Sequence, residues 1–374
     1  MTPPLSNNPV AQLPARKKGQ QIGPVSAVIC NFNGELYLEG CIRALQRMTP
    51  GVAEIIVVDN ASTDGSLEVV RQLFPEVKLL ALAKNGGPCV ARNVGVRAAQ
   101  HRFVLAVDND AVLLEDTLGK LIVALMDRPD AVAAQPRSVY FDDLDKVHYN
   151  GGKFHYAGLY ALRNFSVPMS QAKGSGVLDV DGLIAICILM DSKAFHEVGG
   201  YDEDFFILFE DLDLSMRLRI AGHRLISVED ALVRHKGGTP GISFRGAAYP
   251  KFRSYYHSRN RWLLLYKNYR LRTLIASLPG ILLYEVAWFL FTIKLGHVRA
   301  HIAGKLAFFQ ALTTPRSLRR KVQESRNVRD RDLLVGGPLT LSPQLVEKPL
   351  AAQLARALDS VLRWLWSGLR WIAG

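Results

Sequence analysis

Two carboxylates stand one residue apart directly after a short apolar run. Residues 103–107 are followed by Asp108, Asn109 and Asp110, and then by a second apolar stretch. The apolar run is typical of a strand buried on both faces of a parallel sheet, and residues i and i+2 of a strand point to the same side. Two close anions repel each other unless a cation, such as a divalent metal with oxygen ligands, neutralises them. The same residues also suit a polar strand-to-helix turn, so on these residues alone both interpretations remain open.

Short apolar strands alternate with helical patterns from residue 25 onward. Strands are predicted to begin at residues 25, 53, 77 and 102, and helices at residues 35, 66, 89 and 115. Strand–helix repetition of this kind predicts an α/β fold with a parallel sheet and right-handed connections.

Asp and Asn residues follow each of these four strands. They are Asn31, Asn33, Asp59, Asn60, Asp64, Asn85, Asp108 and Asp110. Because the carboxyl ends of parallel strands share one edge of the sheet, these side chains are expected to line a crevice suited to a nucleotide. The chain has neither a G-x-G-x-x-G nor a G-x-x-x-x-G-K-[ST] motif, which disfavours dinucleotide and P-loop sites.

A second acidic group occurs in the later half of the chain. Glu210, Asp211 and Asp213 follow the apolar residues FFILF and begin a predicted helix that ends at Gly222. Carboxylates at a helix start can serve as caps and dipole partners, or, beside apolar walls, as a general base. His235 stands in the segment VRHKGG. It is either a structural histidine or a ligand for a metal or phosphate.

Five segments, in this order, carry a resemblance to a known family: VVDNASTDGS, NGGPCVARNVGVRAA, LAVDNDAVL, VGGYDEDFFILFEDLDLSMRLRIAGHRL and VRHKGG. Together, over about residues 25–240, they resemble the family 2 inverting glycosyltransferases, and most nearly the bacterial rhamnosyltransferase-like branch. The resemblance implies a GT-A fold, which is Rossmann-like with a mostly parallel sheet. Two departures are Asn109, where a small residue or proline is commoner, and the helix start GGPCV, where related sequences often carry Phe-Ala.

The resemblance also implies a role for each matching position. Asp59 is expected to read the nucleotide base, Asn85 to lie near the nucleoside, and Asn31 to belong to the same donor site. Asp110 and His235 are expected to bind a divalent cation, Mn²⁺ or Mg²⁺, directly. Asp108 is expected to lie nearer the ribose and next to the direct metal ligands. Asp211 matches the catalytic base, although Glu210 beside it is equally acidic. The cation would neutralise the leaving diphosphate, while the base deprotonates an acceptor hydroxyl for in-line, inverting attack.

Positive charge is concentrated in one part of the chain. The net charge is +12, and residues 241–330 alone contain 17 Lys and Arg against 3 Asp and Glu. Within this segment, residues 274–293 are apolar apart from Glu285, Pro279 and a few hydroxyl residues. Twenty apolar residues just suffice to span a bilayer, but the acid and the flanking basic residues favour helices lying in the membrane interface. A buried helical subdomain is the third possibility. The Trp-rich and Arg-rich amphipathic tail, residues 350–374, also suits a membrane surface.

These patterns predict four parts: a disordered leader at 1–22, a GT-A domain at 23–240, a basic and apolar helical membrane-associated region at 241–330, and a linker with a C-terminal amphipathic helix at 331–374. The four scattered cysteines suggest reduced thiols in a cytosolic compartment. We expect transfer of a sugar from dTDP-rhamnose or a UDP-sugar to a polyprenyl-linked glycan. The location would be the cytoplasmic face of the bacterial inner membrane, with peripheral or monotopic attachment and no nucleic acid as partner. The alternatives are a basic nucleic-acid-binding protein and a catalytically inactive membrane scaffold of the same fold.

Overall fold

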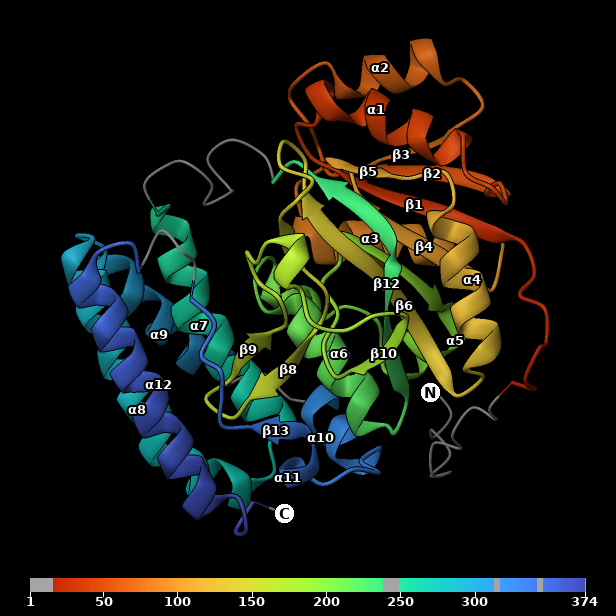
Figure 1. Ribbon diagram of the computed structural model, residues 1–374. Coiled ribbons are helices and arrows are strands. Elements are labelled where there is room, and N and C mark those ends of the chain that lie inside the picture. The colour runs from red at the N-terminus through yellow and green to blue at the C-terminus, as the bar shows by residue number, and fades with distance from the viewer. Residues whose placement is uncertain (1–15, 238–248, 313–316, 342–345, 374) are drawn as a thin grey trace, which may run out of the picture.

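The computed structural model describes residues 16–237, 249–312, 317–341 and 346–373 (Figure 1). Most of the predicted leader, residues 1–15, and the predicted boundary at residue 240 lie outside the described residues. The strands are β1 (Val25–Asn31), β2 (Glu54–Asp59), β3 (Lys78–Ala81), β4 (Phe103–Asp108), β5 (Ala111–Leu113), β6 (Ala131–Tyr140), β7 (Val147–Tyr149), β8 (Gly152–His155), β9 (Leu159–Leu162), β10 (Val177–Val180), β11 (Cys187–Asp191), β12 (Arg224–His235) and β13 (Leu334–Val335). The α-helices are α1 (Glu35–Gln46), α2 (Ser66–Leu73), α3 (Gly87–Ala98), α4 (Thr117–Asp127), α5 (Ser192–Glu197), α6 (Glu210–Ile220), α7 (Lys251–Asn268), α8 (Leu271–Lys294), α9 (Val298–Leu312), α10 (Ser317–Glu324), α11 (Asp330–Leu333) and α12 (Pro349–Leu369).

The central sheet is mixed and largely parallel, with the order β10-β12-β6-β11-β4-β1-β2-β3. Strands β3, β2, β1 and β4 are parallel to one another, as are β12 and β6. Strand β11 lies between the two groups and is antiparallel to both β4 and β6. The predicted α/β fold with a mostly parallel sheet is confirmed. The antiparallel strands in its second half were not predicted.

Helices cover both faces of the sheet (Figure 1). On one face, Ile29 of β1 packs in a core with residues of α1, α2 and α4. On the other face, Val28 packs in a core with residues of α3, α5 and α6. Successive residues of β1 therefore serve opposite layers, as expected for a strand buried on both sides.

The C-terminal helices form a layer beside the small sheet of β13, β8 and β9 (Figure 1). Helix α8 packs against α7, α9 and α12. Within the range that we predict as a linker, residues 334–335 form β13 and pair in parallel with β8. This part of the chain therefore connects the helical layer to the rest of the molecule by backbone hydrogen bonds.

Glu285, the acid within the apolar stretch of α8, points into the helical layer. Arg261 of α7 and Lys305 of α9 form ion pairs with it, the latter at 2.6 Å, and the indole nitrogen of Trp262 donates a bond at 2.8 Å. Burial alone would raise the pKa of Glu285, but these two cations lower it to about 2. The acid is thus an internal ion-pair centre and does not lie on the apolar outer face of α8.

Candidate active site

Asp108, Asp110 and His235 converge at the carboxyl end of β4. Each of the three residues offers one potential ligand atom, and these three atoms all lie within 4.8 Å of one another. The pairing of β5 with β12 explains the arrangement, because it places His235 opposite Ala111, the residue after Asp110. The imidazole Nε2 of His235 is 3.2 Å from Oδ1 of Asp110. Residues 125 positions apart in the chain are therefore brought together by a short antiparallel ladder.

Neighbouring groups fix the orientation of this cluster. The backbone N–H of Gly237 donates to Oδ2 of Asp110 at 3.1 Å, and that of Lys236 donates to the Asp110 carbonyl, also at 3.1 Å. On the other side, His148 of β7 stacks on His235, with 3.3 Å between their Nδ1 atoms. His148 was not predicted from the sequence, because its position beside His235 depends on the pairing of β7 with β6 and has no local signal.

The donor set suits a divalent cation. Two carboxylates and one imidazole, with Asp110 5% exposed and held by backbone donors, offer hard oxygen ligands and one nitrogen. The Asp108 carboxylate is shared, because Arg92 pairs with its Oδ1 at 2.8 Å and offsets part of its charge. Asp110 and His235 would therefore be the principal ligands, with Asp108 shared between the ion and Arg92.

The predicted donor residues form a continuous polar network along the strand ends. Asn31 donates from Nδ2 to Oδ1 of Asp59 at 2.8 Å and accepts at Oδ1 from Asn109 at 2.7 Å. The Asp59 carboxylate also accepts from the backbone N–H and hydroxyl of Ser62, and Asp59 is 1% exposed. In this structure Asp59 holds the β1 and β2 loops together, and its predicted contact with the base stays a prediction.

Asn109 and Asn85 extend this network. Gly34 allows Asn109 to reach Asn31, since a Cβ on Gly34 would lie 2.0 Å from Nδ2 of Asn109. Asn85 accepts at Oδ1 from Nδ2 of Asn60 and from the backbone N–H of Gly87. The uncommon Asn109 thus has a structural partner, and Asn85 joins the end of β2 to the start of α3.

Arg92 of α3 links the two acidic groups of the site. Besides its pair with Asp108, its Nη1 lies 3.4 Å from Oε1 of Glu210 and 3.6 Å from Oδ1 of Asp211. The side chain of Arg92 is 7% exposed. A buried guanidinium of this kind needs carboxylate partners, and three converge on it. Arg92 was not predicted from the sequence, because its three carboxylate partners lie at distant positions of the chain and nothing local distinguishes it from Arg97 of the same helix.

A strained loop presents the acidic pair. Phe206, Leu208 and Phe209 have φ values of 59°, 69° and 71°, in the left-handed region that bulky residues rarely adopt. The Nδ2 group of Asn260, from α7, donates to the carbonyls of Phe205, Ile207 and Leu208 at 2.8–2.9 Å. Asn260 is fully buried. Strain of this kind persists only where surrounding contacts hold it, and Asn260 supplies those contacts from the C-terminal helices.

The two acids at the start of α6 differ in their surroundings. Oδ2 of Asp211 accepts one bond, from the backbone N–H of Ala185 at 3.1 Å. Burial and the adjacent carboxylate of Glu210 raise the pKa of Asp211 to about 8, against the lowering effect of Arg92. Burial also raises the pKa of Glu210. A carboxylate with a pKa raised in this way is a stronger base than an ordinary one, and the fraction that is ionised increases as the pH approaches 8.

A mixed α/β sheet with acidic and amide side chains at the carboxyl ends of its strands has its polar groups where ligands of α/β folds usually bind. The model of glycosyl transferase family 2 matches residues 26–199, and this part of the chain belongs to that family. The succinoglycan biosynthesis protein ExoO of Rhizobium meliloti is 30% identical over 152 residues, which are 40% of this chain and 42% of that protein. The N-acetylglucosaminyl-diphospho-decaprenol L-rhamnosyltransferase of Mycobacterium tuberculosis is 29% identical over 235 residues, 57% of this chain and 75% of that protein.

A solved structure supports the fold assignment. The structure of GalNAc-T7 with UDP, GalNAc and Mn²⁺ superposes with a TM-score of 0.54 at 16% identity, covering 70% of this chain and 51% of that one. The GT-A fold expected from the sequence is confirmed. The chain spans less than half the length of the succinoglycan protein, so the activities of whole relatives do not transfer to it directly.

Proposed function

We propose that this glycosyltransferase is metal-dependent and inverting, and that it transfers a sugar from dTDP-rhamnose or a UDP-sugar to a hydroxyl of a polyprenyl-linked glycan. The observation that carries this proposal is the double role of Asp108. It belongs to the cluster with Asp110 and His235, and through Arg92 it is joined to Glu210 and Asp211. One site therefore combines ligands for a cation with a candidate base.

Each group then has a distinct task. Asp110 and His235 would hold Mn²⁺ or Mg²⁺, which when bound supplies positive charge to the leaving diphosphate. Asp211 accepts the proton of the acceptor hydroxyl in its ionised form, which its raised pKa of about 8 makes a stronger base than an ordinary carboxylate; the ionised fraction, and with it the rate, should therefore rise with pH toward 8. Arg92 keeps the acidic groups together while the charge on Asp211 changes.

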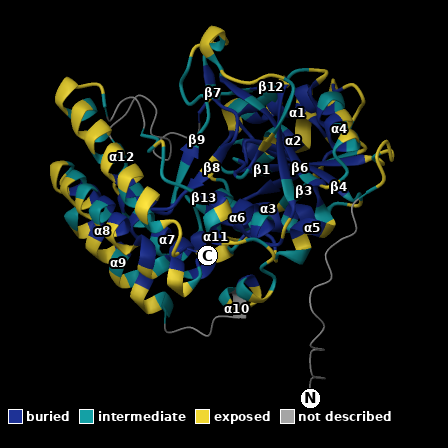
Figure 2. Cartoon of the chain, turned by 60° about the horizontal axis from the view of Figure 1, so that its bottom comes forward, coloured by how far each residue is buried: buried dark blue, intermediate teal, exposed yellow. Residues whose placement is uncertain are grey.

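An apolar outer face supports membrane attachment. Helices α8, α9 and α12 lie side by side and carry exposed residues along one edge of the molecule (Figure 2). The large exposed apolar residues there are Leu271, Ile275, Leu278, Leu282, Val286, Phe289, Leu290, Ile293, Ile302, Leu306, Phe309, Leu350, Leu354, Val361 and Trp364. Patches of this extent are unusual on soluble monomers and mark interaction surfaces. We call this set of residues the apolar face.

The packing favours attachment in the membrane interface over a span. Helix α8 is long and apolar enough to cross a bilayer, but it packs on three neighbouring helices and carries the Glu285 ion-pair centre. One of those neighbours, α7, has buried charged residues such as Arg261 and Lys267. A helical layer that lies in the membrane interface keeps these charged residues paired inside the protein and turns only its apolar side to the lipid. All four cysteines are free, in keeping with the reducing cytoplasmic face.

The alternatives find less support. Arg261 and Lys267 of the basic segment are engaged in ion pairs inside the molecule, with Glu285, Asp202 and Asp213. They are therefore unavailable to grip the phosphates of a nucleic acid. An inactive scaffold would tolerate loss of the acidic residues or of the histidine. In this chain all of them are present, and they lie close together.

Nucleotide release from a panel of nucleotide sugars, with polyprenyl-linked acceptors and with or without Mn²⁺, tests the proposal. We expect one donor to be turned over in Mn²⁺ and not in EDTA. Asp110→Ala should abolish turnover and metal-dependent nucleotide binding while leaving the circular dichroism spectrum unchanged. Wild-type activity of this variant in EDTA, or no turnover of any donor, would contradict the proposal.

A further inference from the structure

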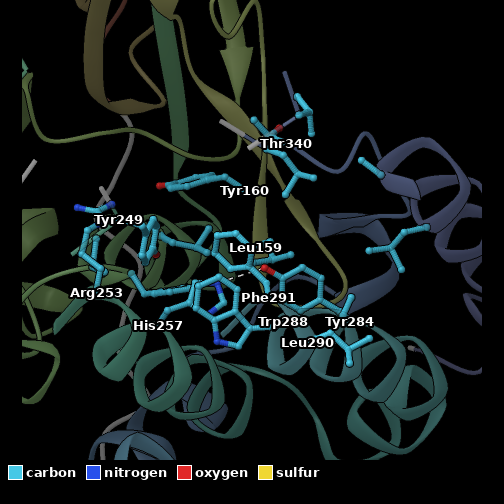
Figure 3. A pocket seen from close by; sticks show the side chains of 18 of the residues that line it. Leu159, Tyr160, Tyr249, Arg253, His257, Tyr284, Trp288, Leu290, Phe291 and Thr340 are labelled. Carbon is cyan, nitrogen blue, oxygen red and sulfur yellow. Dashed lines mark hydrogen bonds between the residues drawn. The ribbon is translucent and has the colours of Figure 1, made fainter. Parts of the chain in front are cut away.

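A largely apolar cavity of about 780 Å³ opens beside the candidate base (Figure 3). Glu210 and Asp211 contribute to its wall from the core, and residues of α7, α8 and α12 contribute from the helical layer. Its volume falls within the roughly 300–1,000 Å³ of ligand sites. The metal cluster residues Asp108, Asp110 and His235 are not part of its lining, so it is distinct from the donor site.

The wall of the cavity is built from aromatic and aliphatic side chains. His257 stacks on Trp288 with 3.8 Å between ring centroids, and its Nε2 lies 3.2 Å from the hydroxyl of Tyr284 (Figure 3). Burial keeps the pKa of His257 well below its usual value, so the ring is neutral. The small side chains of Ala287 and Ala355 leave the space open between α8 and α12. This wall suits a branched, unsaturated hydrocarbon chain.

The lining also carries positive charge. Arg253 lies beside Tyr249 at one end of the cavity, with its guanidinium 5.8 Å from the ring centroid (Figure 3). Lys294, at the end of α8, also belongs to the lining. Guanidinium and ammonium groups are the usual partners of phosphate oxygens. An apolar chamber with cations in its wall therefore fits an amphiphile that has an anionic head.

The cavity continues onto the apolar face. Leu290 of α8 and Leu354 of α12 line the cavity, are 59% and 63% exposed, and also belong to the apolar face. A chain too long for the cavity could therefore leave it between these helices and enter the bilayer without crossing water. The same path leads inward to Asp211, where the acceptor hydroxyl must lie.

We propose that this cavity binds the diphosphate and the first isoprene units of a polyprenyl-linked acceptor. Arg253 and Lys294 receive the phosphates, and the aromatic wall of α7 and α8 receives the hydrocarbon. That the ligand bears the acceptor sugar rests on the proposed function. That the ligand is an amphiphile with an anionic head is inferred from the cavity itself. Its position fixes how far from the membrane the accepting sugar is held.

The experiment measures binding of farnesyl diphosphate, a soluble isoprenoid diphosphate, by calorimetry in EDTA, so that no cation bridges it to the donor site. Inorganic diphosphate and farnesol serve as the head alone and the chain alone. We expect farnesyl diphosphate to bind at least about tenfold more tightly than either. Ala287→Trp and Ala355→Trp, which fill the cavity from different helices, should each weaken it at least about tenfold. The matched control is Ala357→Trp, at an exposed position of α12 outside the lining.

Arg253→Gln separates the two halves of the site. It should weaken binding of farnesyl diphosphate and leave binding of farnesol unchanged. The proposal is overturned if farnesyl diphosphate binds no more tightly than diphosphate, or if both Trp variants bind it like the control. Donor-dependent nucleotide release is measured on the same preparations. Its absence together with normal farnesyl diphosphate binding would contradict the proposed transferase function while leaving the assignment of this cavity intact.

Discussion

Replacement of Asp211 by Asn is expected to stabilise the protein, and increasingly so as the pH rises. The folded-state pKa of Asp211 is raised to about 8 by burial and by Glu210, whereas its ordinary value is 3.8. Between these values the folded protein binds a proton that the unfolded chain has lost, so stability falls with rising pH. One pKa unit corresponds to about 1.36 kcal/mol, which sets a ceiling of about 4 kcal/mol at pH 7. Asn copies the protonated acid and can still accept the bond from Ala185, so the variant avoids this cost.

Thermal unfolding of the wild type and Asp211→Asn at a series of pH values from 4 to 9 tests this reasoning. We expect about 1–2 kcal/mol in practice, because local relaxation and water penetration around a buried charge reduce its cost below the ceiling. With roughly 2–4 °C per kcal/mol for domains of 150–250 residues, the midpoints should coincide near pH 4 and differ by several degrees at pH 8. A difference that is constant with pH, or a variant that becomes relatively less stable as pH rises, would refute the raised pKa.

Three further outcomes follow from the site. Asp211→Asn should keep donor affinity and lose at least about 10²-fold in single-turnover rate, whereas Glu210→Gln should lose less; the reverse order would exchange their roles. Asn260→Ala should lower kcat by roughly tenfold with little change in donor affinity, because the loop before α6 loses its three hydrogen bonds; an unchanged kcat would exclude this positioning role. Trp364→Glu should reduce sedimentation with anionic vesicles, while Leu36→Glu, at an equally exposed apolar position on α1, should not; equal loss in both would contradict attachment through the apolar face.

Much of the fold was predictable because its signals are local. The apolar runs that end in Asp or Asn give the strands β1, β2 and β4, and the helices between them start within a few residues of the predicted positions. The convergence of Asp108, Asp110 and His235 was predicted too, but through the resemblance to a family. For Asp108 and Asp110, residue spacing alone could not decide between a metal site and an ordinary turn. The reason is that Asp and Asn side chains are favoured both in turns and as metal ligands.

The residues that the sequence did not reveal act across long separations. Arg92 meets Glu210 from 118 positions away, and His148 meets His235 from 87 positions away. Neither contact has a periodicity or a spacing that a linear pattern can register. Each depends on the order of strands in the sheet, including the antiparallel β11, which local propensity does not determine.

The C-terminal helices contribute to the candidate active site, because one of them holds the loop that carries the acidic pair. Helix α7 carries Asn260, which holds the strained loop before Glu210, and also His257 and Arg253, which line the cavity. The same helix is fixed to the core where Lys267 pairs with the fully buried Asp213 of α6 at 2.7 Å. A chain that ended before α7 would therefore lose the geometry of its acidic pair as well as the apolar face. The apolar face and the support of the candidate base consequently belong to one packed unit.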